Sequence, residues 1–136
     1  MLFTKASEYA LLSLIFISKK DEPQDVECIS NELEISRSFL AKILQNMARD
    51  GILNSFKGAN GGFMLSRSPE NITMLEVVES AERHEMSVFE CSKSRDLCKK
   101  GEECKIWNIF NDIQMHVDEY LGGIKLSEVM SKRCGV

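Results

Sequence analysis

Residues 35–65 read ISRSFLAKILQNMARDGILNSFKGANGGFML, and this stretch decides the fold. Its first half predicts a helix from Ser36 to Asp50, because Ser36 is a favourable helix cap and Gly51 a common helix end. Apolar side chains recur at helical spacing along one side, at Leu40, Ile43, Leu44 and Met47. The opposite side carries small, polar and basic side chains, at Arg37, Ser38, Ala41, Lys42 and Gln45. The stretch therefore predicts an amphipathic helix with a basic outer face.

A shorter helix is predicted just before this one, because Val26, Ile29 and Leu33 also fall at helical spacing. Two short helices joined by a tight turn, the second basic outside, are typical of a helix-turn-helix. In such a motif the second helix enters the DNA major groove. An ordinary helical hairpin with a solvated face is the alternative at this point.

Two short β-like runs follow at residues 52–56 and 63–65, and Asn60-Gly61 between them is a strong hairpin signal. A hairpin directly after a recognition helix makes a winged helix. The tip of this wing offers groups suited to a DNA phosphate or a minor-groove edge, at Lys57, Asn60, Gly61 and Gly62. The glycines allow close backbone approach there, although they also simply permit a tight turn.

The remaining ordered parts are predicted to be helical. Thr4 can cap a first helix to about Ser18, which is nearly apolar all round and therefore expected to be buried. Further along, Thr73-x-x-Glu76 forms a capping box for another helix. The chain is thus predicted to be mainly α-helical with a small β wing.

A long helix is predicted near the carboxyl end, before Gly122-Gly123 and a short returning helix at residues 126–130. It carries one continuous apolar stripe, at Ile106, Ile109, Phe110, Ile113, Val117, Tyr120 and Leu121. A stripe of this length outside a small core needs a partner surface. We therefore expect a symmetric homodimer, with packing against its own domain as the alternative.

Three cysteines lie in the stretch CSKSRDLCKKGEEC, at Cys91, Cys98 and Cys104. This stretch is too polar to fold by burying itself, and three thiolates on a metal centre could hold it in place. Structural zinc usually begins from C-x₂₋₄-C pairs, which are absent, whereas longer and uneven spacings suit an iron–sulfur cluster. Three unpaired thiols on a mobile loop remain the alternative. Cys28, inside a predicted helix, is expected to be a small buried hydrophobe, and Cys134 has no assigned role.

Composition excludes several classes of protein. The 136 residues are 43% hydrophobic and 28% charged, as in an ordinary globular protein, and the longest apolar stretch is too short to span a bilayer. No signal peptide is evident, so we expect a reducing cytosol, in which five cysteines favour metal or redox chemistry. The net charge is −4, yet residues 35–67 hold five basic side chains against one acidic. That window predicts a local anion-binding face.

Together these motifs resemble the IscR/NsrR (Rrf) family of bacterial winged-helix transcription regulators. The resemblance rests on FTKASEYALL, on IS-x-SFL-x-KIL, on GIL-x-S-x-KG-x-x-GGF-x-L-x-R-x-P, and on three cysteines followed by a long helix. It implies a homodimer that binds double-stranded promoter DNA through the helix from Ser36 and the wing. It also implies an iron–sulfur cluster, 2Fe–2S or 4Fe–4S, on Cys91, Cys98 and Cys104. Members respond to iron–sulfur supply, nitric oxide or redox state, and act as repressor or activator.

Two positions depart from better-studied members. IscR-type proteins have a histidine ligand three residues after the third cysteine, where this chain has Trp107. NsrR-like relatives use an acidic residue of the first helix from the other subunit, and Glu8 occupies that position here. Some IscR-type proteins also carry a glutamate, which can read cytosine, at the recognition-helix position where this chain has Ala41. A known operator sequence is therefore not assigned to this chain.

The resulting interpretation divides the chain into a DNA-binding domain at residues 1–83 and a cysteine loop with a dimerisation helix at residues 84–136. We expect a cytoplasmic regulator with no membrane segment and no small-molecule substrate beyond the cluster and its reactive signal. A zinc-stabilised DNA-binding adaptor and an iron–sulfur electron carrier are the alternatives. An enzyme is not expected, because no nucleophile–base pair with a recognisable motif is present.

Overall fold

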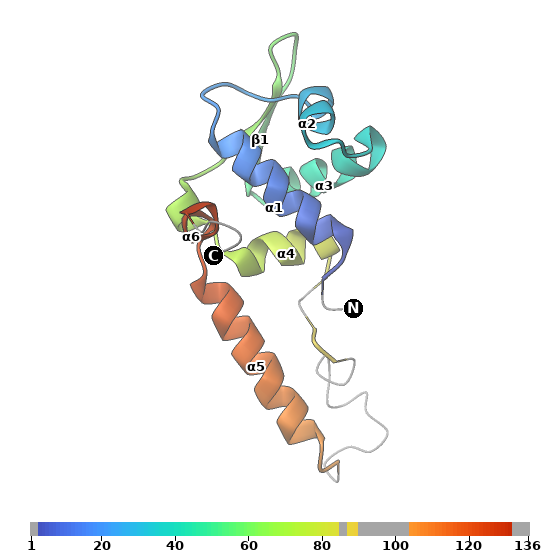
Figure 1. The fold of residues 1–136 in the computed structure, drawn as a ribbon, viewed down its shortest axis with the longest axis vertical. Helices are drawn as coiled ribbons and strands as arrows, with labels where there is room; N and C mark the ends of the chain where they lie inside the picture. Colours follow the sequence, from blue (N-terminus) through green and yellow to red (C-terminus); the bar gives the residue numbers. More distant parts are fainter. Residues whose placement is uncertain (1–2, 85–86, 90–103, 132–136) are drawn as a thin grey trace.

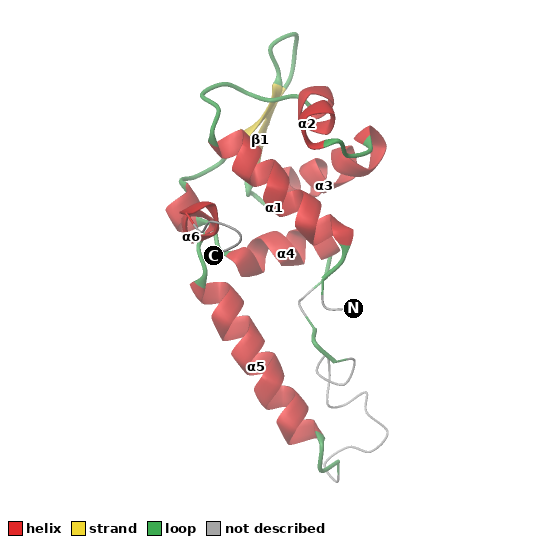
Figure 2. Cartoon of the chain, in the orientation of Figure 1, coloured by secondary structure: helices red, strands yellow, loops and turns green. Residues whose placement is uncertain are grey.

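The computed structural model describes residues 3–84, 87–89 and 104–131 (Figures 1 and 2). The elements follow the chain in this order: α1 (Lys5–Ser18), α2 (Val26–Leu33), α3 (Arg37–Arg49), β1 (Leu53–Phe56), β2 (Gly62–Leu65), the 3₁₀ helix η1 (Pro69–Asn71), α4 (Met74–Glu82), α5 (Trp107–Gly123) and α6 (Leu126–Ser131). The prediction of a mainly helical chain with a small two-stranded wing is confirmed.

The main core lies between α1, α3, the hairpin and α4. Leu14 of α1, Leu40 and Leu44 of α3, and Val77 of α4 are fully buried in it. Thr4 caps α1 as expected, its hydroxyl accepting a hydrogen bond from the Ala6 amide at 3.2 Å. The expectation that α1 is buried all round is only partly met, because Leu12 is 40% exposed.

The turn between α2 and α3 is tight because Glu34 takes a left-handed conformation (φ 55°) after the last turn of α2. The Ser30 hydroxyl donates to the Ile35 carbonyl at 2.6 Å and closes the turn. Ser36 stands at the cap position of α3, but its hydroxyl makes no capping hydrogen bond and lies 3.2 Å from that of Ser38. The predicted helix-turn-helix is therefore confirmed, and the predicted role of Ser36 as a side-chain cap is wrong.

The wing is an antiparallel hairpin in which Leu53 pairs with Leu65 and Phe56 pairs with Gly62. Five residues separate Phe56 from Gly62, so Asn60-Gly61 does not form the tight two-residue turn that the dipeptide favours. The left-handed positions are instead Gly58 (φ 104°) and Gly62 (φ 148°). The hairpin prediction is confirmed, but its turn is a longer loop.

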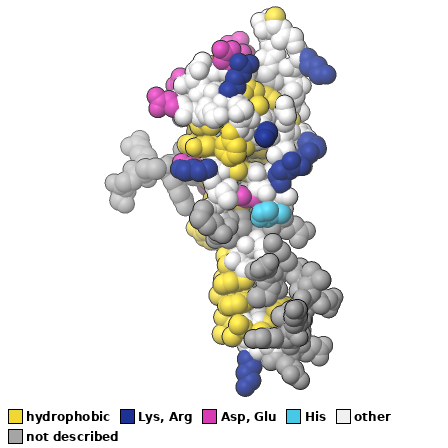
Figure 3. All heavy atoms as spheres, turned by 90° about the vertical axis from the view of Figure 1, so that its right-hand side faces the viewer, with side chains coloured by type: hydrophobic (Ala, Val, Ile, Leu, Met, Phe, Trp, Pro, Cys, Tyr) yellow, Lys and Arg dark blue, Asp and Glu magenta, His cyan; other side chains and the backbone are white. Residues whose placement is uncertain are grey.

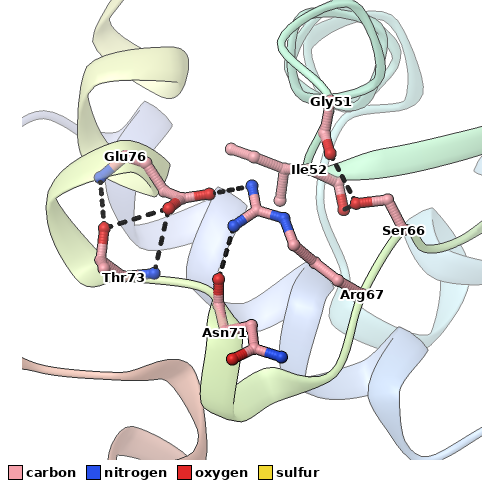
Figure 4. Close-up of polar contacts among 7 residues, drawn as sticks. All are labelled: Gly51, Ile52, Ser66, Arg67, Asn71, Thr73 and Glu76. Carbon is pink, nitrogen blue, oxygen red and sulfur yellow. Dashed lines mark hydrogen bonds and ion pairs between the residues drawn. The ribbon is translucent and has the colours of Figure 1, made fainter.

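A polar cluster fixes the base of the wing to the start of α4 (Figure 4). Arg67 forms an ion pair with Glu76 and donates to the Asn71 carbonyl. Glu76 also completes the predicted capping box, since the Thr73 hydroxyl accepts from its amide at 3.2 Å. On the other side of the wing base, the Ser66 hydroxyl bonds the Gly51 and Ile52 carbonyls.

Helix α5 leaves this core and extends well beyond it (Figure 1). Only its carboxyl-terminal half packs on α4, through Val117 and Leu121 against Val78. Helix α6 then returns and places Leu126 in the main core. Just before it, Lys125 forms an isolated antiparallel β-bridge with Thr73. Within the described residues, no helix is long and apolar enough to cross a membrane.

Candidate nucleic-acid interface and metal ligands

The outer face of α3 presents a row of exposed polar and basic side chains. Ser38, Lys42 and Gln45 are exposed, while Leu40, Ile43 and Leu44 between them are buried in the core. Arg49 continues this row one turn later, at the same helical spacing, and is also exposed. Sequence reasoning counted Arg49 only as a charge, although the 38-42-45-49 spacing could have placed it on this face. Arg37 is exposed too, but it lies at the edge of the row, one residue before Ser38.

The wing stands next to this face and exposes Lys57 and Asn60 at its loop. Its glycines have a structural role. A Cβ on Gly61 would lie 2.3 Å from the Phe56 carbonyl oxygen, and one on Gly62 would lie 2.4 Å from the Gln24 carbonyl carbon. Gln24 and Phe63 exchange two backbone hydrogen bonds, of 3.1 and 2.8 Å, so the wing is pinned to the segment before α2. These close contacts explain why glycine stands at both positions, and the role of the two glycines at DNA stays a prediction.

Charge is unevenly distributed over the molecule. Figure 3 shows Lys and Arg side chains spread over the upper, winged-helix part of one face, with Asp and Glu side chains mostly near its margin. One of the five basic residues counted in the sequence does not contribute to a free anion-binding face, because Arg67 is held by Glu76. The local positive charge therefore comes chiefly from α3 and Lys57.

The start of α1 is tied to the end of α4 through one carboxylate oxygen. Glu82 Oε1 accepts hydrogen bonds from the Thr4 amide at 2.9 Å, the Thr4 hydroxyl at 2.6 Å and the Ser7 hydroxyl at 2.6 Å. Burial alone would raise the pKa of Glu82, but these hydrogen bonds outweigh it and hold the pKa below its ordinary value. The same turn of α1 packs the Tyr9 ring edge-on against Phe39 of α3, at 5.7 Å between centroids.

Among the predicted metal ligands, Cys91 and Cys98 lie outside the described residues. Cys104 is half-buried in the turn before α5, where its carbonyl accepts from the Trp107 amide at 3.3 Å. Glu8 is exposed in the first turn of α1, and its carboxylate pairs with Lys5 at 2.9 Å. The described residues contain no group of three or more potential ligands, so the proposed ligand set stays a prediction.

The chain holds two further cysteines and two histidines. Cys28 is exposed, with its sulfur 3.6 Å from the Gln24 Oε1, so the expectation of a buried cysteine is wrong. The spacing of Val26 and Ile29, which point inward, places Cys28 on another side of α2. His84 and His116 are exposed, and Cys134 lies outside the described residues.

Comparison with known proteins gives one family match. The family model Rrf2, described as an iron-dependent transcriptional regulator, matches residues 3–132. HTH-type transcriptional regulators from Aquifex aeolicus and Haemophilus influenzae are 26% and 27% identical, covering 96% and 98% of this chain and 92% and 89% of theirs. IscR of Xenorhabdus nematophila is 24% identical over 98% of this chain and 81% of its own.

Two solved structures share the fold. CymR, the global cysteine regulator of B. subtilis, superimposes with a TM-score of 0.78 at 22% identity, covering 96% of this chain and 97% of that chain. T. potens IscR superimposes with a TM-score of 0.70 at 16% identity, covering 99% and 94%. At these identities the similarity establishes the winged-helix fold alone.

Proposed function

Because the chain belongs to the Rrf2 family of iron-dependent transcriptional regulators, we propose that it is a dimeric DNA-binding regulator controlled by an iron–sulfur cluster. The chain is a helix-turn-helix transcriptional regulator, as its relatives are, and these relatives are regulators and not enzymes. The proposal adds the residues that read DNA, the cluster and the dimer.

DNA recognition rests on the exposed row of α3 beside the wing. In our proposal α3 enters the major groove, where side chains read bases and fix the register on phosphates. The wing then meets the adjacent backbone or minor groove. The DNA-binding residues are Ser36, Arg37, Ser38, Lys42, Gln45, Lys57, Asn60, Gly61 and Gly62. Ala41 offers at most a methyl contact to thymine, so the operator of a relative with glutamate at this position is not transferred to this chain.

The proposed cluster ligands are Cys91, Cys98 and Cys104, with Glu8 of the partner subunit at the remaining position. The donor set fits the group: three thiolates suit an iron–sulfur cluster, and the indole of Trp107 cannot serve as the fourth ligand. Glu8 supports the assignment because its carboxylate is exposed, which leaves it accessible to a second chain. When bound, the cluster would supply a centre that reacts with oxidants or nitric oxide. Cys104 holds the end of the cysteine segment at the start of α5.

The proposed dimer uses the exposed stripe of α5. Ile106, Ile109 and Tyr120 are 55%, 61% and 66% exposed, and Ile113 is 37% exposed, all on one side of the helix. Apolar side chains this exposed in a continuous row mark an interaction surface. In this arrangement residues 1–83 bind DNA and residues 84–136 carry the cluster and the dimer contact.

A second candidate is control by a cysteine-linked signal. The likeness to CymR, named as a cysteine regulator, favours it, although that likeness establishes only the fold. Such a regulator would use the same α3 and wing, but would not need iron.

Anaerobic purification followed by a visible spectrum and assays of iron, sulfide and zinc tests the proposal. We expect a brown protein with iron and acid-labile sulfide, lost on changing Cys91, Cys98 or Cys104 to Ala. The matched control Cys28→Ala should retain the cluster, because this thiol is exposed on α2. Duplex binding should differ between the cluster-bound and cluster-free protein. Zinc without sulfide, or no metal, would overturn cluster sensing and leave the DNA-binding assignment standing.

A further inference from the structure

A groove of about 610 Å³ lies between α3, the end of α4 and the start of α1. Its apolar floor includes Phe39, Ile43 and Ala81, and its charged lining side chains are Lys42, Arg49 and Arg83. No carboxylate is among the described residues that line it. The groove therefore concentrates positive charge beside the outer face of α3. Lys42 and Gln45 belong both to that face and to the lining of the groove.

Arg83 comes from outside the helix-turn-helix and the wing. It is the residue directly after α4, it is exposed, and its backbone is left-handed (φ 65°), with its amide bonded to the Glu79 carbonyl at 2.9 Å. Its neighbour Glu82 is fixed to α1 by the three hydrogen bonds described above. The backbone at Arg83 is thus held in place by both α1 and α4.

Three acidic side chains nearby line a different cavity, and the carboxylate of Glu82 is held by Thr4 and Ser7. Arg49 and Arg83 also line a second cavity of about 410 Å³, which contains Asp50, Glu76 and Glu79. Within the described residues, neither Lys42 nor Arg83 forms an ion pair with a carboxylate. The groove side of the arginine pair is therefore open to an external anion.

We propose that this groove binds DNA phosphates, so that the DNA-binding face continues from α3 onto the end of α4, with Arg83 and Arg49 as phosphate contacts. The inference rests on the proposed DNA-binding function and adds a surface to it. Guanidinium groups bind phosphate oxygens in a bidentate way, and the groove is continuous with the α3 face that reads the duplex. Arg83 also stands directly before the segment that carries the cysteines, so one phosphate contact lies at the junction between the two proposed functions.

The test is the salt dependence of binding to a mixed-sequence duplex of about 30 base pairs, long enough for two half-sites. Arg83→Asn removes the charge with a residue that tolerates the left-handed conformation. One phosphate contact contributes about 0.9 to the log–log slope, so the parent-to-variant affinity ratio should grow about eightfold per tenfold dilution of salt. The loss should be the same on other duplex sequences, because phosphate contacts carry no base readout.

The matched control is Lys19→Ala, which removes one exposed cation at the far end of α1, roughly 20 Å from the groove. It should keep the parent slope. Circular dichroism checks the fold, and Arg83→Gly replaces Arg83→Asn if the latter does not fold. If Lys42→Ala flattens the salt dependence while Arg83→Asn keeps the slope of the parent, the groove assignment is overturned and the proposed function is not. Absence of duplex binding by the parent would overturn the proposed function itself.

Discussion

Replacing Glu82 by Ala removes the acceptor of three hydrogen bonds at once, because the Thr4 amide, the Thr4 hydroxyl and the Ser7 hydroxyl all donate to its Oε1. The amino-terminal turn of α1 then loses its attachment to α4. Hydrogen bonds to a charged group contribute roughly 1.5–3 kcal/mol when buried. These lie at a partly exposed edge of the fold, so we expect about 0.5–1 kcal/mol each and about 1.5–3 kcal/mol in total.

The assay is urea denaturation followed by circular dichroism, at one fixed protein concentration because subunit association would shift the midpoint. Glu82→Gln keeps an acceptor oxygen without the charge and should restore about half of the loss. Glu22→Ala, an exposed carboxylate in the turn after α1, should change stability by less than about 0.5 kcal/mol.

The pH dependence follows from the lowered pKa of Glu82 in the folded state. Its stabilising effect is present above the unfolded value of 4.5 and is lost as pH falls through the lower folded-state value. The advantage of the parent over Glu82→Gln should therefore be full at neutral pH and shrink below about pH 4.5. A Glu82→Ala protein within about 0.5 kcal/mol of the parent at pH 7 would refute the reasoning.

Two further predictions concern the wing and the proposed dimer. Gly62→Ala should weaken the wing more than Gly58→Ala, because a Cβ at Gly62 meets the Gln24 backbone at 2.4 Å whereas one at Gly58 meets nothing within 4 Å. We expect Gly58→Ala to lower the free energy of unfolding by about 1 kcal/mol because of its positive φ, and Gly62→Ala to lower it clearly more. Urea denaturation and amide exchange at Phe63 measure the two losses. Equal losses would contradict the close contact at Gly62. Ile109→Glu should shift the protein to monomer in sedimentation analysis, since that side chain is 61% exposed within the α5 stripe. Met115→Glu, 60% exposed on the opposite side of α5, should leave the association unchanged, and identical behaviour of the two variants would remove the stripe from the interface.

The fold could be predicted from the sequence because its local signals agree with one another. The capping box at Thr73 and Glu76, the apolar stripe of α3 and the two β-like runs all appear in the structure at the expected places. Each is decided by neighbours a few residues away, which a sequence pattern records directly.

The features that were missed depend on contacts between distant segments. The wing is attached to the segment before α2 by the pairing of Gln24 with Phe63, which no local pattern reveals. A count of charges cannot separate Arg67, held by Glu76, from Lys42, which faces outward. For the candidate site, the row on α3 follows from helical spacing, while the groove needs the end of α4 to be placed beside it.

The attachment of Thr4 to Glu82 also has a consequence for how the protein is made. The two residues lie 78 positions apart, so the first turn of α1 cannot be secured until α4 has been synthesised. At about 5–20 residues per second, translation takes roughly 4–16 s to cover that distance. Residues 26–65, which form α2, α3 and the wing, are contiguous and leave the ribosome within the interval. Helix α1 thus emerges before the residue that secures its first turn, and a chaperone acting on the nascent chain would find that turn unattached to α4 during those seconds.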